Sequence, residues 1–355
     1  MNDEIVMKTM KQVAVTRFGV LMFVLAMVIG VALDRWVIDR FLPLPSTEVW
    51  GNVLEKQKRV EKKRAVPEDY DLKGLKIPKE DIISVLPIDA IPALTRPEVV
   101  GAKAAKFLGD EDRVLGVVVD GVSRAYPVNV LNWHEIVNDE LGKVNVGIIY
   151  CPLCDSFSVV DREIVKGKVL SFGVSGMLYN SNVMMYDREG KGLWSQVYMQ
   201  ALSGKYAGKS LKHLPFEVTH WGAWKKKHPK TDVMTFETGH GRNYTKNPYA
   251  NYFKHDEIRD KFAPKHRDKR MKNKEMVIGV RYAGVVRAYP VKTMMKGMKD
   301  GVFAWKIDGK VFEVGIGDGG KTVAVKSFPE GAVVVKTFWY AWAAFHPKTE
   351  IYGAE

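Results

Sequence analysis

Both cysteines of this 355-residue chain lie in one short stretch, Tyr150-Cys-Pro-Leu-Cys154. Outside the cytoplasm such a pair can form a structural disulfide, exchange disulfides with a partner, or bind a metal. Closing so small a ring adds little stability, and an internal proline is typical of redox motifs. The text before Cys151 is strand-like, however, so the strand–helix context of redox folds is missing. All three interpretations stay open at this point.

A metal site would need more than the two thiolates. Two cysteines cannot form a four-thiolate zinc site, so histidine must supply further ligands. We take Cys151, Cys154 and His134 as the candidate metal ligands. Sulfur with imidazole is a soft ligand set, which suits copper or zinc.

We expect Cys151 to be the reactive or ligating residue, with Cys154 as its supporting partner. The strand-like run Val144–Tyr150 delivers Cys151 to a strand end, and Pro152 stops the strand because it lacks a backbone donor. We expect His134 to be the nearest imidazole to the sulfur and Glu135 to be a catalytic base or to orient that imidazole. The residues expected to line the pocket and bind a cofactor are Tyr179, Asn180, Asp187 and Gln196.

Two repeats indicate which elements position these residues. The segment Arg113–Val130 has the pattern of a β-hairpin with an Asp-Gly turn. It recurs as Met276–Thr293 at an offset of 163 residues, the difference between Gly279 and Gly116. The tryptophan-containing segment His220–Val233 recurs at an offset of 118 residues. We therefore predict a β-rich α+β fold built as a tandem duplication of a hairpin-to-helix unit.

The first copy is 163 − 118 = 45 residues longer than the second. His134 and Cys151 both belong to text that the second copy lacks, and the offset of 163 places Gly297 opposite His134. Residues that serve only packing should occur in both copies. Because His134 and Cys151 are both missing from the second copy, they indicate a functional site in the first copy, with the second copy as scaffold.

The sixteen residues Phe18–Leu33 carry no charge and follow Lys8, Lys11 and Arg17. As a helix this run is about 24 Å long, between a signal-peptide core and a spanning helix. We predict an uncleaved N-terminal membrane helix, with a cleaved signal as the alternative. The basic flank places the N-terminus in the cytoplasm. The protein is then single-pass in the cytoplasmic membrane, with its bulk on the periplasmic or extracellular side.

The formal net charge of +13 resides mainly in this exported part, where nucleic acid is an unlikely target and anionic lipid or other envelope proteins are the expected partners. The predicted segments are a cytoplasmic N-terminus (1–17), an anchor with its interface (18–42), a Pro-rich spacer (43–110), the first copy with the cysteine site (111–264), and a basic linker with the second copy (265–355).

Six motifs together resemble the family catalogued as domain of unknown function 3179 (DUF3179). They are NWHEIVND, IIYCPLCDSF, FGVSGMLYNSNVMMYDR, LWSQ, HWGAWKKKHP and NPYANY. The resemblance covers about residues 85–260 and implies an exported or membrane-anchored protein. It also implies that Cys151 is the firmer cysteine position, which weakens both disulfide interpretations. The chain departs from the family pattern mainly at Arg188–Trp194, where REGKGLW replaces the usual Thr-Gly-Ser turn.

Two classes of function remain from the sequence. The first is a membrane-anchored extracytoplasmic protein with a redox or metal site centred on cysteine and histidine. The second is a non-catalytic anchored subunit or binding module of an envelope complex, with the cysteine pair as a structural disulfide.

Overall fold

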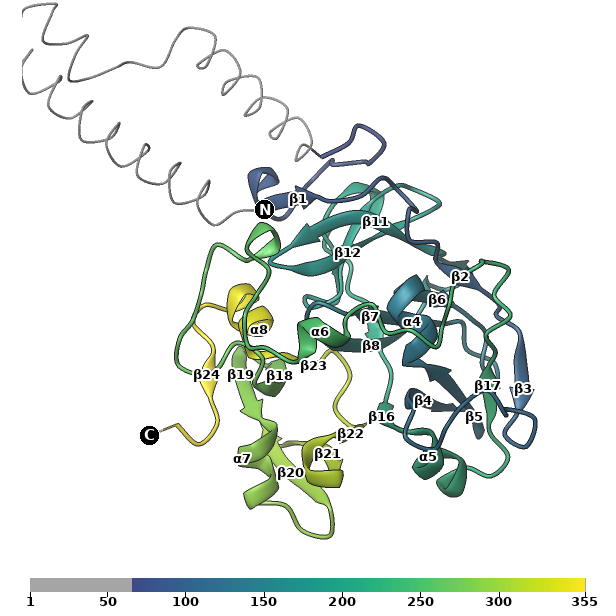
Figure 1. The fold of residues 1–355 in the computed structure, drawn as a ribbon. Coiled ribbons are helices and arrows are strands. Elements are labelled where there is room, and N and C mark those ends of the chain that lie inside the picture. Colours follow the sequence, from purple (N-terminus) through teal and green to yellow (C-terminus); the bar gives the residue numbers. More distant parts are fainter. Residues whose placement is uncertain (1–65, 355) are drawn as a thin grey trace, which may run out of the picture. The chain divides into compact units, whose positions relative to one another are not determined.

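The structure is a computed structural model that describes residues 66–354, all within one compact unit that begins at Arg64. Twenty-four strands and five α-helices lie among these residues (Figure 1), which confirms the predicted β-rich α+β class. Between residues 66 and 354 no helix has the length and apolar character needed to cross a bilayer. The predicted anchor, Phe18–Leu33, lies outside the described residues.

The hairpin-to-helix text folds into two units with the same connections. In each unit an outer strand pairs antiparallel with the first hairpin strand, a Trp-bearing helix follows, and the last strand pairs parallel with the second hairpin strand. The first unit consists of β16 (Phe216–His220), β4 (Arg113–Val119), β5 (Val122–Pro127), helix α5 (Trp221–Lys227) and β17 (Asp232–Met234). The second consists of β23 (Val333–Phe338), β18 (Met276–Tyr282), β19 (Val285–Pro290), helix α8 (Trp339–Phe345) and β24 (Glu350–Ile351).

A glycine in each unit lets the helix lie directly on the hairpin. A Cβ added to Gly116 would lie 2.2 Å from the ring of Trp224, and one added to Gly279 would lie 2.1 Å from the ring of Trp342. The indole N–H of Trp342 donates to the hydroxyl of Thr349 over 2.9 Å, and the first unit repeats this bond. The tryptophans of the two helices are therefore core residues.

Each unit is extended by three strands from the other half of the chain. Strands β6, β7 and β8 follow the first hairpin in sequence, but β8 pairs with β23 of the second unit. Strands β20, β21 and β22 follow the second hairpin, but β22 pairs with β16 of the first unit. We call these two three-strand segments the exchanged meanders. Their bounds are β6 (Ile136–Asn138), β7 (Val146–Cys151), β8 (Ser156–Asp161), β20 (Val302–Ile307), β21 (Lys310–Gly317) and β22 (Thr322–Ser327).

The pairings produce three large sheets and a separate two-stranded sheet of β9 and β10. Sheet I has the order β2-β6-β7-β8-β23-β18-β19-β24 with β15 beside β8, sheet II has the order β20-β21-β22-β16-β4-β5-β17-β3, and sheet III has the order β1-β11-β12-β13-β14. The 66–110 segment supplies β1, β2 and β3, one strand to each large sheet. The remaining strands are β1 (Ile82–Ser84), β2 (Leu94–Thr95), β3 (Val99–Gly101), β9 (Glu163–Val165), β10 (Lys168–Val169), β11 (Phe172–Tyr179), β12 (Asn182–Asp187), β13 (Leu193–Ser195), β14 (Gln200–Ala201) and β15 (Lys212–His213). The other helices are α4 (Val128–His134), α6 (Ala250–Phe253) and α7 (Val291–Lys296).

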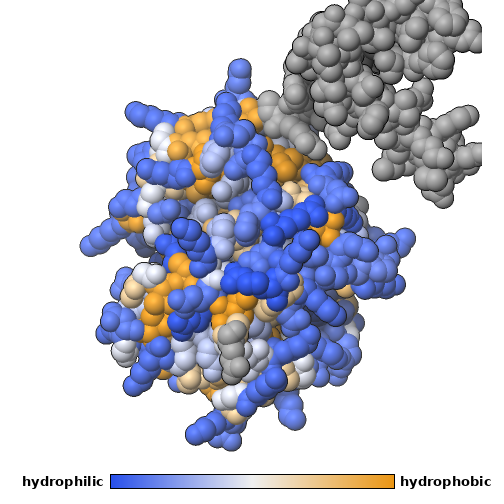
Figure 2. Space-filling view, turned by 90° about the vertical axis from the view of Figure 1, so that its left-hand side faces the viewer, coloured by the Kyte–Doolittle hydropathy of each residue, from blue (hydrophilic) through white to orange (hydrophobic). Residues whose placement is uncertain are grey.

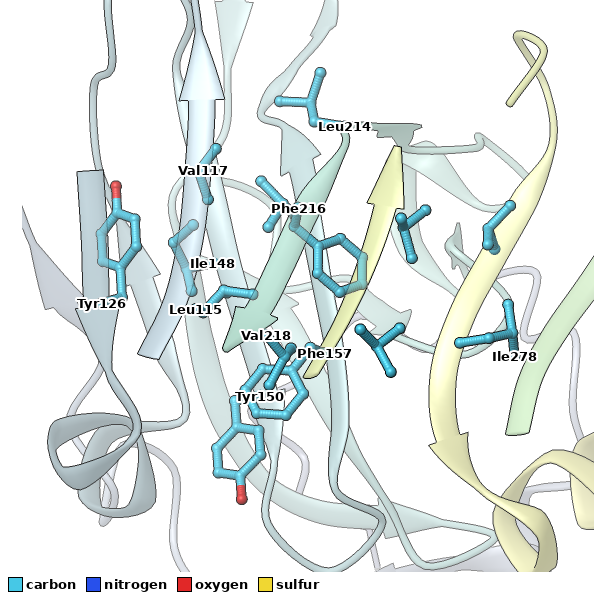
Figure 3. Packing of buried hydrophobic residues seen from close by; sticks show 14 of the residues in the cluster. Leu115, Val117, Tyr126, Ile148, Tyr150, Phe157, Leu214, Phe216, Val218 and Ile278 are labelled. Atoms are coloured by element: carbon cyan, nitrogen blue, oxygen red, sulfur yellow. The ribbon is translucent and has the colours of Figure 1, made fainter. Parts of the chain in front are cut away.

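The main core lies between sheets I and II. Alternate side chains of each strand enter it, as the two-residue period of a strand requires. In β7, Ile148 and Tyr150 belong to this core, whereas Ile149 and Cys151 face a second cluster on the other side of the sheet. Figure 3 shows part of the main core, with Leu115, Val117, Tyr126, Ile148, Tyr150, Phe157, Leu214, Phe216, Val218 and Ile278 labelled. Cys151 is therefore placed on the face of sheet I that turns away from sheet II.

Candidate functional site

The cysteines occupy the tight turn between β7 and β8. Cys151 is the last residue of β7, and the backbone N–H of Cys154 donates to the carbonyl of Cys151 over 3.2 Å. Asp155 adopts a left-handed backbone conformation with φ 43°, and β8 begins at Ser156, which pairs with Cys151. The strand end predicted at the Cys-Pro bond is confirmed.

Both cysteines are free thiols, and their sulfur atoms share one acceptor. The side chains are buried, with 1% of Cys151 and none of Cys154 exposed. The carbonyl of Ser181 lies 3.8 Å from the Cys151 sulfur and 3.3 Å from the Cys154 sulfur. Asn180 and Ser181 form the turn between β11 and β12 with φ values of 48° and 65°. This turn aims the shared carbonyl at the thiols.

Two tyrosine hydroxyls close over the turn from elements distant in sequence. Tyr252 of α6 and Tyr340 of α8 both donate to the carbonyl of Leu153, over 3.0 and 2.9 Å. The Tyr340 hydroxyl also lies 3.6 Å from the Cys154 sulfur. The Lys274 ammonium lies 3.4 Å from the centre of the Tyr252 ring, a cation–π contact that holds the tyrosine in place. Helix α8 of the second unit thus forms part of the site, together with the β6–β8 meander that carries the cysteines.

The surroundings of Cys151 favour its protonated form. Burial raises the pKa of Cys151 well above its ordinary value, and the Cys154 side chain raises it further. A reaction at Cys151 therefore requires a group that takes the thiol proton.

Glu135, the residue predicted as a catalytic base, is buried just before β6. It is a single residue between α4 and β6, with φ 59° and only 7% of its surface exposed. Burial raises the pKa of its carboxyl well above the usual range, and the electrostatic repulsion of Cys151 adds to the shift. Burial raises the pKa of the half-buried Tyr249, and the negative charges of Glu135 and Cys151 raise it further. The three side chains therefore share one electrostatic environment.

Asp155, the residue after Cys154, anchors a buried ion triad. Its carboxylate accepts hydrogen bonds from Arg113 over 3.0 Å and from the Lys336 ammonium over 2.7 Å. Burial alone would raise the pKa of Asp155, but Arg113 and Lys336 hold it below its ordinary value. Burial lowers the pKa of Lys336 to about 8, against the attraction of Asp155. The triad ties the cysteine turn to β4 and to β23.

The imidazole ring of His134 is hydrogen-bonded to groups other than the cysteines. Its Nδ1 lies 2.7 Å from the carbonyl of Pro92 and its Nε2 lies 2.7 Å from the hydroxyl of Tyr244, so both ring nitrogens are engaged. Its ring packs against that of His240 with centroids 5.1 Å apart. Burial lowers the pKa of His134. Neither cysteine sulfur is a hydrogen-bond partner of this ring among the described residues, and a common site with Cys151 stays a prediction.

Of the four predicted pocket residues, Tyr179 and Asn180 lie at the β11–β12 turn that faces the thiols. Gln196 bonds to the carbonyls of Ile149 and Ser156 over 3.1 and 3.0 Å, which places it in the buried network beside β7. Asp187 lies at the opposite end of the hairpin from Asn180. A cavity of about 440 Å³ lies elsewhere, where Gly167, Lys205 and Tyr206 contribute to its lining.

The ligand set for a metal is not assembled within residues 66–354. No group of three or more His, Cys, Asp or Glu side chains lies close enough there to hold an ion. A closed zinc site needs four ligands, and the two neighbouring thiols supply two. The residues therefore do not fit a zinc site, and they would suit only a metal that accepts two soft sulfur ligands.

Sequence reasoning missed the site residues supplied from a distance: Ser181, Tyr252, Tyr340, Lys336 and Arg113. Signals for two of them were present. The family motif NPYANY contains Tyr252, and the offset of 118 places Tyr340 opposite Gly222 of the first copy. A bulky hydroxyl where the other copy has glycine is the kind of difference that marks a special role.

Comparison with known proteins gives a family match. The model of the family described as "Protein of unknown function (DUF3179)" matches residues 88–334. No curated protein and no solved structure matches the chain.

Proposed function

The chain belongs to the DUF3179 family, and we propose that it is a membrane-anchored extracytoplasmic protein whose Cys151–Cys154 pair is a thiol redox centre. Cys151 is the reactive residue in this proposal, and Cys154 is the partner that resolves its reaction. The observation that carries the proposal is the shared acceptor: both free thiols lie within 3.8 Å of one carbonyl, that of Ser181. Sulfurs held side by side in this way need little movement to bond to each other.

The reaction would be exchange with a disulfide of an envelope partner. The Cys151 thiol loses its proton, and its sulfur attacks one sulfur of the partner disulfide, so that a mixed disulfide forms and one partner thiolate leaves. The Cys154 thiol then loses its proton and attacks the Cys151 sulfur, which releases the second partner thiolate. Two electrons pass to the partner, its two thiolates take up the two protons, and Cys151–Cys154 becomes the disulfide. Tyr252 and Tyr340 must move aside for this contact, since both cysteines are buried.

The test is a redox titration of the full-length protein in detergent. Samples are equilibrated with oxidised and reduced dithiothreitol or glutathione, free thiols are alkylated, and the oxidised fraction is read by mass spectrometry. We expect a midpoint between about −120 and −270 mV, the range of thiol oxidoreductases. Cys154→Ser is the matched control and should show no two-electron transition. A midpoint below about −300 mV, typical of structural disulfides, or no transition at all would refute the redox centre.

Copper(I) is the second candidate, on the observation that the site gathers two soft sulfurs. Cys151 and Cys154 would hold the ion, which would supply one-electron transfer or simply be carried. Elemental analysis of protein purified without chelators tests this. Copper that disappears in both Cys151→Ser and Cys154→Ser would support it, and protein free of bound metal after incubation with Cu(I) would exclude it. The earlier expectation that His134 is a ligand requires its ring to leave Pro92 and Tyr244.

A non-catalytic subunit or binding module remains the alternative to both. In that case the cysteine pair is a structural disulfide with a midpoint below about −300 mV, and the working surface lies elsewhere. Figure 2 shows the face on which β24 lies in Figure 1, largely covered by hydrophilic side chains with a few apolar patches between them. The basic insert Lys265–Lys274 is the segment we would test there, with anionic lipid vesicles as the probe.

The proposed location is the cytoplasmic membrane, single-pass, with the body on the periplasmic or extracellular side. The uncharged run Phe18–Leu33 after a basic flank supports this orientation. Protease added to intact spheroplasts should digest residues beyond the membrane helix. If these residues are protected, the proposed orientation is wrong. We also propose that the two units arose by tandem duplication, which is supported by their matching strand connections and by the paired contacts of Gly116 and Gly279 with a tryptophan.

A further inference from the structure

One irregular segment lies over the cysteine turn. We call residues 246–274 the strap; it contains α6 and one short 3-10 turn, and it is the green chain around α6 in Figure 1. The Tyr252 hydroxyl donates to the carbonyl of Leu153, which lies between the two cysteines. The Ser181 hydroxyl, whose residue also supplies the shared carbonyl, donates to the carbonyl of Phe262. The strap is therefore attached to the residues that position both sulfur atoms.

Few side chains hold the strap in place. Tyr252 and Phe262 are buried in the same cluster as Cys151 and Cys154, whereas most residues of the strap are exposed. No β-strand lies between residues 246 and 274, so no sheet hydrogen bonds tie the strap down. Segments with few buried contacts open at low cost in free energy. The outer surface of the strap is thus available to another molecule.

The strap concentrates positive charge. Residues 246–274 contain ten Lys or Arg and four Asp or Glu, so they supply +6 of the formal net charge of +13. Three of the cations are in ion pairs: Arg267 with Asp260, Arg270 with Asp268, and Lys265 with Asp81. Like charges held in so short a segment repel one another. Stability therefore does not explain the excess, and a negatively charged partner would.

Two cations lie on the aromatic rings that cover the thiols. The Arg259 guanidinium is 5.4 Å from the centre of the Tyr252 ring, and the Lys261 ammonium is 4.6 Å from the centre of the Phe262 ring. A third cation, Lys254, directly follows α6. All three are exposed, and within residues 66–354 none of them forms an ion pair. Positive charge is therefore gathered where a partner of the cysteines has to arrive.

We infer that the strap is the docking surface for an acidic protein partner of the thiols. The inference rests on the proposed thiol exchange and adds the kind of partner that brings the disulfide, a protein with Asp or Glu around its cysteines. Charge complementarity of this kind raises association rates about ten- to thousandfold. An anionic membrane would also be attracted, but it offers the cysteines no disulfide. The acidic protein is the occupant that suits both the strap and the thiols beneath it.

The first test measures disulfide exchange by the full-length protein in non-ionic detergent. Two peptides carry one cysteine as a mixed disulfide with thionitrobenzoate, flanked by three glutamates in one and by three lysines in the other. Exchange releases thionitrobenzoate, which is followed by its absorbance, and each rate is divided by that of the same peptide with 2-mercaptoethanol. At about 20 mM salt the acidic peptide should react at least about tenfold faster than the basic one. At about 0.5 M salt the ratio should approach one, because the charges are screened.

A variant without the three exposed cations tests whether the strap causes this preference. It carries the substitutions Lys254→Gln, Arg259→Gln and Lys261→Gln, and it should lose most of the preference for the acidic peptide. The matched control removes three exposed lysines of α7, β20 and β21 and should keep the preference: Lys296→Gln, Lys306→Gln and Lys310→Gln. Equal rates for the two peptides with the wild type, or an unchanged preference in the strap variant, would overturn the inference.

A binding measurement separates docking from thiol chemistry. Fluorescein-labelled peptides with serine in place of the cysteine are titrated with the protein and followed by fluorescence anisotropy. If the acidic peptide binds through the three cations but no peptide exchanges, the docking surface stands and the proposed redox function fails. If both peptides exchange equally and neither is bound in preference, the redox function stands and the docking surface fails.

The membrane is tested with the full-length protein in phosphatidylcholine nanodiscs, mixed with vesicles that contain phosphatidylserine and separated by flotation. Vesicle binding that depends on the three cations, without binding of the acidic peptide, would show that the strap meets a lipid surface and would overturn the inference. Binding of the acidic peptide with no vesicle binding would support the acidic protein as the partner.

Discussion

Asp155→Asn is the substitution that should damage the cysteine turn most without touching a cysteine. The Asp155 carboxylate lies 2.7 Å from the Lys336 ammonium, and the Lys336 side chain is only 2% exposed. Arg113 is the other partner, but a third of its side chain reaches solvent. Removing the negative charge therefore leaves the Lys336 ammonium buried without a counter-charge, whereas Arg113 can turn toward water.

Breaking a buried ion pair from one side costs about 3–5 kcal/mol, a large part of the roughly 5–15 kcal/mol that stabilises a typical domain. The pH dependence follows from Lys336. Its pKa is about 8 in the folded protein and its ordinary value is 10.5, so between these values the unfolded chain binds more protons and the free energy of unfolding rises with pH. Loss of Asp155 lowers this pKa further. The difference between variant and wild type should therefore shrink from pH 7 to pH 10, as the amine becomes neutral in both.

The assay is urea unfolding of the full-length protein in detergent, followed by tryptophan fluorescence at pH 7 and pH 10. Glu140→Gln, which removes an exposed ion pair with Arg96, is the matched control and should cost less than about 1 kcal/mol. The double variant Asp155→Asn with Lys336→Met should recover much of the loss, since the stranded charge is gone. A loss in Asp155→Asn no larger than in Glu140→Gln, or one independent of pH, would refute this account of the triad.

Three further outcomes are expected in the same unfolding assay. Gly279→Ala should cost at least about 1–3 kcal/mol, because the new methyl group meets the Trp342 ring at 2.1 Å, whereas Gly101→Ala has open space and should be neutral within about 0.5 kcal/mol. Thr349→Val should cost about 1–3 kcal/mol, because the buried indole N–H of Trp342 loses its acceptor. Glu135→Gly should raise the free energy of unfolding by about 1 kcal/mol or more, because it relieves the strain at φ 59° and removes a buried carboxyl, and a destabilised variant would contradict the strain argument.

Local signals in the sequence predicted the local structure of the site. Pro152 cannot donate a ladder hydrogen bond, and β7 ends at the residue before it. The Asp-Gly dipeptide fixes a tight hairpin, because both residues tolerate positive φ, and Asp120 and Gly121 adopt it. These features depend on a few neighbouring residues, so a single sequence is enough to predict them.

The long-range part of the site could not be read in the same way. A repeat shows which segments match, but not which strands pair, so the exchanged meanders have no signature in the sequence. The Ser181 carbonyl is a backbone atom, and any residue type could have supplied it. The positive φ of Glu135 is imposed by its hydrogen bonds to Leu131 and Tyr150 rather than by its own preference. Each of these depends on contacts made only after the chain has folded.

The exchanged meanders also determine when the protein can fold during synthesis. Strand β8 pairs with β23 through Phe157 and Lys336, so sheet I cannot close until nearly the whole chain has been made. Folding dominated by such distant pairings is slow, because the entropy of closing a long loop is lost before the contacts form. Until then β8 has an open edge that can pair with other chains. Folding of this protein in the cell should therefore depend on factors that shield unpaired strands, and truncation before β23 should yield aggregates rather than a stable half.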